Sequence, residues 1–182
     1  MIFQKTDLSG VYIIDLEPQF DQRGFFARQW SQDQSPDSGL TTGFVQCSIS
    51  FNELKGTLRG MHFQHKPYEE VKIVRCTMGR MVDVILDIRP DSPTFKQWIS
   101  VELSADNHKS VYISKGLAHG FQTLEDRTEV YYQISEYYHP ESSGRVGWDD
   151  PEFNILWPIS PAIISDADRG YIPFTRQDYF KR

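Results

Sequence analysis

Short runs of β-branched and aromatic residues, separated by turn residues, recur along almost the whole chain, and few windows show the 3.6-residue repeat of a helix. We expect strands at residues 11–14, 43–51, 71–76, 81–88, 98–103, 109–113, 120–123 and 129–135. Their number and spacing are typical of an antiparallel sandwich or barrel. The sequence therefore predicts an all-β jelly roll with short peripheral helices, in one domain spanning residues 1–182.

One connection and two less regular segments complete this prediction. The turn Thr77-Met78-Gly79-Arg80 joins residues 71–76 to 81–88, and a short connection containing glycine is typical of a β-hairpin. We therefore expect these two strands to pair with each other. Residues 32–40 are expected to form a loop or a short helix, and the segment from Pro151 shows no clear periodicity.

Composition narrows the class of protein. Apolar residues make up 39% of the 182 residues, enough for a core without disulfides or metal, and no apolar run approaches the ~20 residues of a membrane helix. The first residues lack the pattern of a signal peptide. The two cysteines, Cys47 and Cys76, are expected to be buried free thiols. This use of cysteine fits a reducing cytoplasm, where we expect the protein to be. With a net charge of −6 and scattered basic residues, the chain is expected to bind neither membrane nor nucleic acid.

Residues that could carry chemistry gather in a few places. Residues 55–72 contain Arg59, His62, His65, Glu69, Glu70 and Lys72. Arg59 and His62 cannot share a face of a regular strand, so a kink or bulge at Gly60 is needed to turn both inward. Further candidates are His119 between two glycines, the tyrosines at 131, 132, 137 and 138, and the pair Asp166 and Asp168. Of the remaining histidines, we expect His65, His108 and His139 to be structural.

A metal site is one interpretation of the glycine and histidine spacing. Gly56 followed by His62, and Gly116 followed by His119, resemble the two halves of the cupin metal motif, with Glu69 near the position of its glutamate ligand. A metal-dependent dioxygenase or isomerase using His62, Glu69 and His119 is therefore an alternative function. Its weak point is Gln64, which stands where the motif has a histidine.

Several longer motifs resemble a known family. They are residues 21–26 (DQRGFF), 58–64 (LRGMHFQ), 83–89 with 92–95 (DVILDIR and SPTF), 116–121 (GLAHGF), 148–150 (WDD) and 157–158 (WP). In this order they resemble the dTDP-4-dehydrorhamnose 3,5-epimerase family over nearly the whole chain. The resemblance implies a cupin-type jelly roll, usually a homodimer, that epimerises nucleotide-linked 4-keto-6-deoxy sugars without a metal ion or another cofactor.

The resemblance also implies roles for individual residues. The general base falls on His62, its partner carboxylate on Asp168, the general acid on Tyr132 and the enolate-stabilising lysine on Lys72. A neutral imidazole can remove a proton made acidic by a neighbouring ketone at neutral pH. The implied substrate-binding residues are Arg23, Gln46, Ser48, Arg59, His119 and Tyr138, and Arg23 is expected to reach the site of a neighbouring subunit.

Four positions differ from the family's pattern. They are Arg28, Ser48, Ser143 and Ala167, at positions that typically contact the nucleotide or the sugar. The four residues expected to carry the chemistry match. We therefore expect the chemistry to be retained, and the nucleotide, the keto sugar and the choice between C3, C5 or both stay open.

Overall fold

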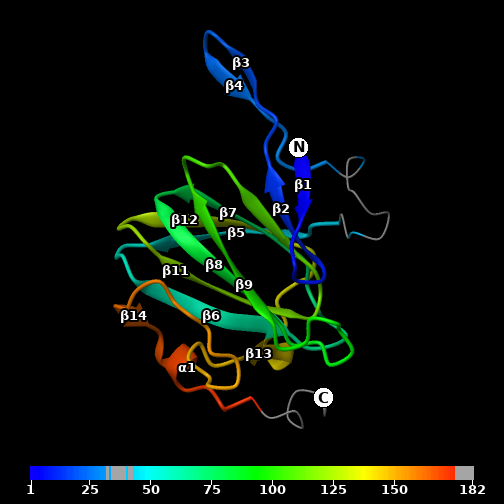
Figure 1. The fold of residues 1–182 in the computed structure, drawn as a ribbon, viewed down its shortest axis with the longest axis vertical. Helices are drawn as coiled ribbons and strands as arrows, with labels where there is room; N and C mark the ends of the chain where they lie inside the picture. Colours follow the sequence, from blue (N-terminus) through cyan, green and yellow to red (C-terminus); the bar gives the residue numbers. More distant parts are fainter. Residues whose placement is uncertain (32, 34–39, 41–42, 175–182) are drawn as a thin grey trace.

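Two β-sheets pack face to face in the computed structural model, which describes residues 1–31, 33, 40 and 43–174 (Figure 1). The first sheet has the order β1 (Ile2–Lys5), β2 (Val11–Asp15), β10 (Ser110–Ile113), β7 (Lys72–Met78), β12 (Thr128–Ile134) and β5 (Gln46–Asn52). The second has the order β13 (Ser143–Arg145), β6 (Thr57–Gln64), β11 (Leu117–Thr123), β8 (Arg80–Asp87) and β9 (Trp98–Ser104). Neighbouring strands in both orders run antiparallel.

Smaller elements lie outside these two orders. The hairpin of β3 (Gln19–Asp21) and β4 (Gly24–Phe26) projects away from the body (Figure 1). A 3-10 turn, η2 (Pro140–Ser142), precedes β13, and β14 (Ile163–Ile164) pairs with β6 in parallel before the short helix α1 (Asp166–Arg169). The predicted all-β jelly roll and its short peripheral helical turns are confirmed. The predicted loop or short helix at residues 32–40 lies mostly outside the described residues.

The predicted hairpin between residues 71–76 and 81–88 is wrong. Both strands form, as β7 and β8, but they belong to different sheets. β7 pairs with β10 and β12, whereas β8 pairs with β11 and β9. Gly79, with a φ of +75°, turns the chain from one sheet to the other, and a Cβ atom there would lie 3.2 Å from the Cα of Thr128. A tight turn reverses the chain but does not determine which strand pairs with the next one. The same turn residues suit a hairpin within one sheet and a crossing from one sheet to the other.

The core has three layers because both sheets are covered on both faces. Between the sheets lie Val74, Cys76, Ile85, Val111, Phe121 and Val130, among others. The outer face of the second sheet is covered by Val146, Phe153, Ile155 and Phe174, which follow β12 in the sequence. The outer face of the first sheet is covered by Met1, Trp30 and Phe44. Strands such as β11, which is buried at every position, therefore lack the alternation of a half-exposed strand.

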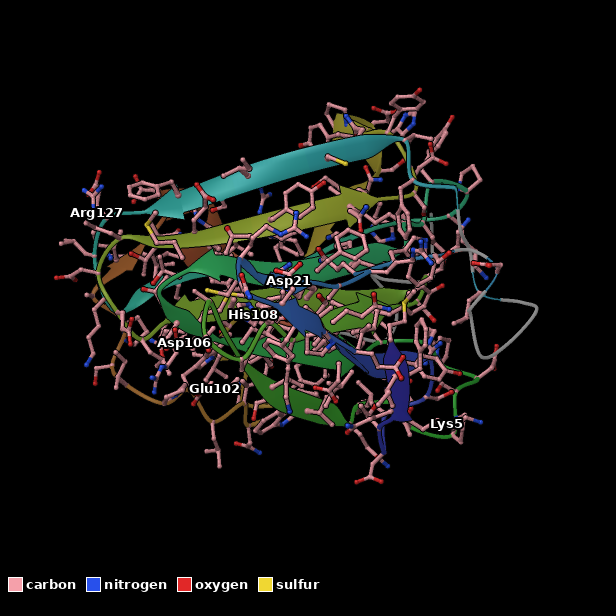
Figure 2. The ribbon with its side chains drawn as sticks, turned by 90° about the horizontal axis from the view of Figure 1, so that it is seen from above. Lys5, Asp21, Glu102, Asp106, His108 and Arg127 are labelled. Carbon is pink, nitrogen blue, oxygen red and sulfur yellow. The ribbon has the colours of Figure 1, made fainter. Side chains whose placement is uncertain are left out.

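Polar residues lie mainly at the periphery. Lys5, Glu102, Asp106 and Arg127 extend from the outside of the sandwich (Figure 2). In the described part of the chain, no helix has the length and apolar character that a membrane crossing requires. Cys76 is buried as expected, but the prediction for Cys47 is wrong because Cys47 is exposed. Cys47 lies on β5, the last strand of the first sheet, and in the described part of the chain no strand pairs with the outer edge of β5.

Candidate active site

The side chains that face the space between the sheets change from apolar to polar toward one end of the sandwich. On β7, Lys72 continues the row of Val74 and Cys76, and on β12, Tyr132 continues the row of Val130. His119 stands between Leu117 and Phe121 in the same way on β11. Because side chains alternate along a strand, every second residue of these strands is placed in one interior space.

These rows surround a pocket of about 450 Å³. Eight of the residues singled out from the sequence line it: Gln46, Ser48, Arg59, His62, Lys72, His119, Tyr132 and Tyr138. They come from strands β5, β6, β7, β11 and β12 and from the segment that follows β12. Residues that are far apart in the sequence are therefore brought together by the strand order of the two sheets.

His62 and Asp168 form a direct contact at the edge of this pocket. The Nε2 atom of His62 lies 2.7 Å from Oδ1 of Asp168, and the His62 side chain is 39% exposed whereas that of Asp168 is 6% exposed. The Gly60 amide donates to the other carboxylate oxygen at 3.4 Å. Burial alone would raise the pKa of Asp168, but hydrogen bonds from His62 and Gly60 and the charge of His62 hold it below its usual value. A charged carboxylate therefore orients the imidazole through Nε2, and the described residues form no hydrogen bond with its Nδ1 atom.

A bulge in β6 lets Arg59 and His62 face the same pocket, as the sequence required. Across the β6–β11 pair, His62 lies opposite His119 and Arg59 lies opposite Phe121, so three steps on β6 match two on β11. Gly60 has a φ of +137°, and a Cβ atom there would lie 2.5 Å from the Cα of Gly120. Glycine is required at this position because the two backbones approach so closely.

Tyr132 and His119 line the pocket side by side, and His119 is paired with a second aspartate. His119 Nε2 lies 2.5 Å from Oδ1 of Asp83, whose side chain is fully buried. The rings of His119 and Tyr132 meet edge to face at 6.3 Å. Burial, and then the charge of Asp83, raises the pKa of Tyr132 far above its usual value, while Arg59 opposes this. The phenol therefore stays protonated, as a proton donor must.

Lys72 is held by a carboxylate that also lines the pocket. Its Nζ atom lies 2.7 Å from Oε1 of Glu70, and the two side chains are 12% and 13% exposed. Gln64 donates to the other oxygen of Glu70 at 3.2 Å. A lysine ammonium held in this way can stabilise negative charge that develops on a bound molecule.

Arg23 is the predicted site residue that the fold does not bring to the pocket. It lies at the tip of the β3–β4 hairpin, where its side chain is 89% exposed and pairs with Asp21. One ring contact joins the projecting hairpin to the body, between Phe25 and His108, whose ring centroids lie 5.1 Å apart. Arg23 is therefore available to another molecule and not to the pocket of its own chain.

Four residues around the site were not singled out for these roles from the sequence. The sequence places Glu70 in the charged cluster of residues 55–72 and Asp83 in the motif of residues 83–89, but it predicts no partner for either. Asn52 accepts a hydrogen bond from Arg59 Nε at 2.8 Å, and Arg145 Nε lies 3.4 Å from Asp168 Oδ1. Arg145 sits on the three-residue strand β13, directly opposite His62 in the ladder. Such a short strand carries no periodicity that a sequence could reveal.

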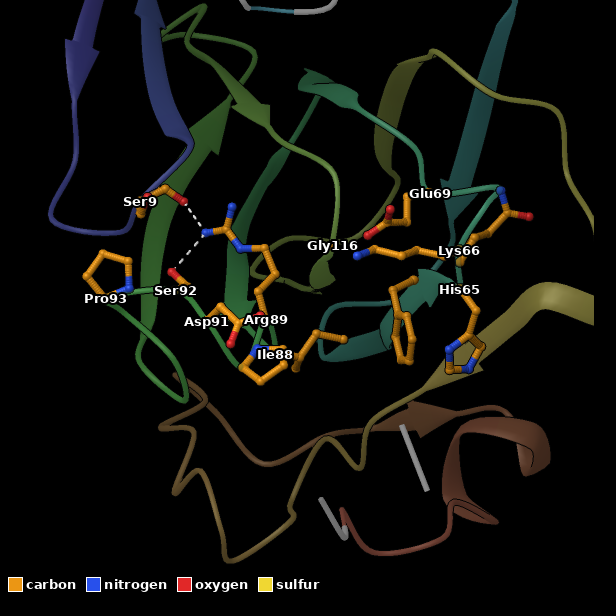
Figure 3. A pocket seen from close by; sticks show the side chains of 13 residues that line it. Ser9, His65, Lys66, Glu69, Ile88, Arg89, Asp91, Ser92, Pro93 and Gly116 are labelled. Carbon is orange, nitrogen blue, oxygen red and sulfur yellow. Dashed lines mark hydrogen bonds between the residues drawn. The ribbon is translucent and has the colours of Figure 1, made fainter. Parts of the chain in front are cut away.

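The alternative metal site is wrong because its three residues do not converge. His62 and His119 are paired with Asp168 and Asp83, and Glu69 lines a different pocket of about 660 Å³ together with Lys66 and Arg89 (Figure 3). Among the described residues, no group of three or more His, Cys, Asp or Glu side chains is arranged to hold a metal ion. Gln64, which stands where a metal ligand was expected, binds protein groups instead.

The four positions that differ from the family pattern are placed differently. Ser48 and Ser143 line the pocket that contains His62. Arg28 lines a separate hollow near Met1 and Glu17, and Ala167 lies next to Asp168 on the exposed side of α1. Within one chain, Ser48 and Ser143 are therefore the two differences that can touch a molecule bound in this pocket.

Comparisons with known proteins agree with this geometry. The family model described as dTDP-4-dehydrorhamnose 3,5-epimerase matches residues 5–176. An enzyme of that name from Shigella flexneri is 38% identical over 97% of both chains. The crystal structure of one from Elizabethkingia anophelis superposes with a TM-score of 0.93 at 34% identity, covering 99% of both chains. The crystal structure of a dTDP-6-deoxy-D-glucose-3,5-epimerase from Legionella pneumophila, in complex with dTDP-4-keto-L-rhamnose, gives a TM-score of 0.85 at 36% identity, covering 92% of this chain and 89% of that one. With a family model that matches residues 5–176 and relatives that match almost the whole chain, this chain belongs to the dTDP-4-dehydrorhamnose 3,5-epimerase family and is an epimerase.

Proposed function

We propose that this epimerase acts on a dTDP-linked 4-keto-6-deoxy sugar and inverts C3, C5 or both. The observation that carries the proposal is the contact between His62 and Asp168 in a pocket also lined by Tyr132 and Lys72. A C4 ketone makes the protons on C3 and C5 acidic. A base, an acid and a cation around one sugar ring are what inversion next to a ketone needs.

In the proposed mechanism, His62 removes the proton from the carbon beside the ketone. The electron pair of the broken C–H bond forms a C=C bond, and negative charge moves to the C4 oxygen. Lys72 stabilises this enolate, a contribution of about 2.7–4 kcal/mol by analogy with oxyanion-hole donors. Tyr132 then protonates the same carbon from the opposite face, and the enolate returns to the ketone. Solvent takes the proton from His62 and restores the one on Tyr132, so the enzyme ends unchanged.

The nucleotide end of the substrate is expected to bind at the cationic side of the pocket. Arg59 and Arg145 line it, and an arginine fork suits the oxygens of a diphosphate. Gln46, Ser48, His119 and Tyr138 complete the proposed binding surface, with Tyr138, which is 62% exposed, as an aromatic wall.

The proposed active form is a homodimer in the cytoplasm. Arg23 projects on an exposed hairpin together with Phe20, which is 75% exposed, and Phe26, which is 69% exposed. Apolar side chains exposed this far are typical of a surface that another protein covers. In the proposed dimer, each hairpin supplies Arg23 to the nucleotide bound by its neighbour.

Proton NMR in deuterated water tests the proposal. The purified protein is incubated with dTDP-4-keto-6-deoxyglucose, and the C3 and C5 proton signals are followed separately. Loss of both signals shows proton removal at both carbons, as a double epimerase requires, and loss of one identifies the single carbon from which a proton is removed. Absence of exchange at both carbons would contradict this substrate and direct the search to other nucleotide sugars, beginning with the differences at Ser48 and Ser143.

A further inference from the structure

Gln64 uses every polar atom of its side chain to hold two loops at the pocket. The residue is 4% exposed. Its Nε2 atom lies 2.9 Å from the Tyr68 carbonyl oxygen, 3.1 Å from that of Tyr137 and 3.2 Å from Oε2 of Glu70. Its Oε1 atom accepts a hydrogen bond from the His139 amide at 2.7 Å. One buried amide therefore links the loop that carries Glu70 to the segment that carries Tyr138.

Glu70 is an unusual side chain for a pocket that binds an anion. Among the described residues that line this pocket, it is the one carboxylate, whereas Arg59, Lys72 and Arg145 are cations. A carboxylate here repels a diphosphate and would weaken binding if it were free. Glu70 is instead paired with Lys72 at 2.7 Å, and both side chains are largely withdrawn from water. We therefore expect the role of Glu70 to be its ion pair with Lys72 and not a contact with the substrate.

A lysine needs such a partner in this setting because its ammonium group sits on a flexible chain. A diphosphate in the same pocket attracts it, and the attraction between opposite charges is strong where water is scarce. An ammonium group drawn to the phosphates would leave the ketone oxygen without its cation. Glu70 opposes this by holding the ammonium group in place before the substrate enters.

We propose that Glu70, fixed by Gln64, is a positioning residue that holds Lys72 at the enolate oxygen and away from the diphosphate. The inference rests on the role proposed above for Lys72. Loss of a residue that binds substrate weakens binding. Loss of the Glu70 charge is instead expected to strengthen binding of the diphosphate and to lower kcat.

The variant Glu70→Gln tests the inference, because the amide keeps the shape and can still bond to Gln64 but loses the charge. We expect kcat to fall about 10- to 100-fold, as for a misplaced catalytic group, while KM is unchanged or lower. Binding of dTDP alone, measured by calorimetry, is expected to be unchanged or tighter. A merely structural role would not separate kcat from KM in this direction.

Glu69→Gln is the matched control, since it removes the same charge from the neighbouring residue, which lines the other pocket. It is expected to behave like wild type. Gln64→Glu, which places a second carboxylate beside Glu70, is expected to lower kcat as well, and thermal unfolding of all variants identifies any that fail to fold.

Lys72→Ala, measured in parallel, separates the two claims. An inactive Lys72→Ala beside a Glu70→Gln with the kcat of wild type overturns the role of Glu70 alone. A Glu70→Gln that raises KM and leaves kcat unchanged also overturns it. A Lys72→Ala with full activity contradicts the proposed role of the lysine itself.

Discussion

The pocket between the sheets and the β3–β4 hairpin both carry residues expected to act on the substrate, yet they are built in opposite ways. In the pocket, His62, Lys72 and Tyr132 each stand on a strand and each has a fixed neighbour. On the hairpin, Arg23 is 89% exposed and its contacts are local. Groups that move protons need fixed geometry and little water, whereas a group that grips a phosphate can arrive from outside. In the proposed dimer the chemistry thus belongs to one chain, and the second chain supplies part of the binding.

The largest expected effect comes from the pocket. The variant His62→Asn keeps a polar side chain at this position but has no base, and general-base catalysis typically contributes 10²–10⁴-fold. We expect turnover to fall by about a thousandfold, with dTDP binding retained in calorimetry. Turnover close to that of wild type would remove His62 as the base and break the proposed division between chemistry and binding.

A smaller effect is expected on the hairpin. Loss of one charge-assisted contact in Arg23→Ala is expected to raise KM about tenfold, with little change in kcat. Steady-state kinetics at low and high substrate concentration separate the two parameters.

Mixed dimers decide which chain Arg23 serves. A dimer of one Arg23→Ala chain and one His62→Asn chain contains one complete site if the hairpin acts on its neighbour. We therefore expect the mixture to regain activity at low substrate concentration. If each hairpin served its own chain, the mixture would not regain it.

The smallest expected effect is on the free energy of unfolding. It is measured at two carboxylates, Asp168 in the pocket and Asp21 on the hairpin. The pKa of Asp168 lies below its usual 3.8 in the folded chain, so its ionised form contributes stability above that pH, and the contribution is lost as pH falls through the folded value. The gap in free energy of unfolding between wild type and Asp168→Asn should therefore narrow in acid. Urea unfolding from pH 7 to pH 3 measures it.

Asp21→Asn is the matched variant on the hairpin. The hydrogen bond from Arg23 also lowers the pKa of Asp21, but this pair is fully exposed and screened by water and salt. We expect a much smaller gap at every pH. Equal gaps for the two variants would mean that the Asp168 pair is no more than a surface contact.

Most of the pocket residues were predicted from the resemblance to the family, and the strand pattern agrees with their placement. Alternation places Lys72 and Tyr132 on the interior face once the strand is known, and the need for a bulge at Gly60 followed from the spacing of Arg59 and His62. Strand partners could not be predicted in the same way. The Gly79 turn suggested a hairpin, whereas the chain crosses to the other sheet there.

Contacts made by short or irregular segments also could not be predicted from the sequence. Arg145 reaches Asp168 from a strand of three residues, and Gln64 finds its partners in two loops. Glu69 and Glu70 are neighbours in the sequence but line different pockets. The path of the loop determines which pocket each side chain reaches. Such partners depend on how distant segments pack, and no local pattern records this.

In the proposed mechanism, His62 removes the proton and Tyr132 returns one from the other face of the sugar, and this division of roles separates exchange from inversion. It is tested most directly by Tyr132→Phe in deuterated water, with solvent exchange and inversion followed in the same NMR experiment. We expect exchange catalysed by His62 to continue while inversion is lost. Loss of exchange and inversion to the same extent, or retention of both, would contradict it.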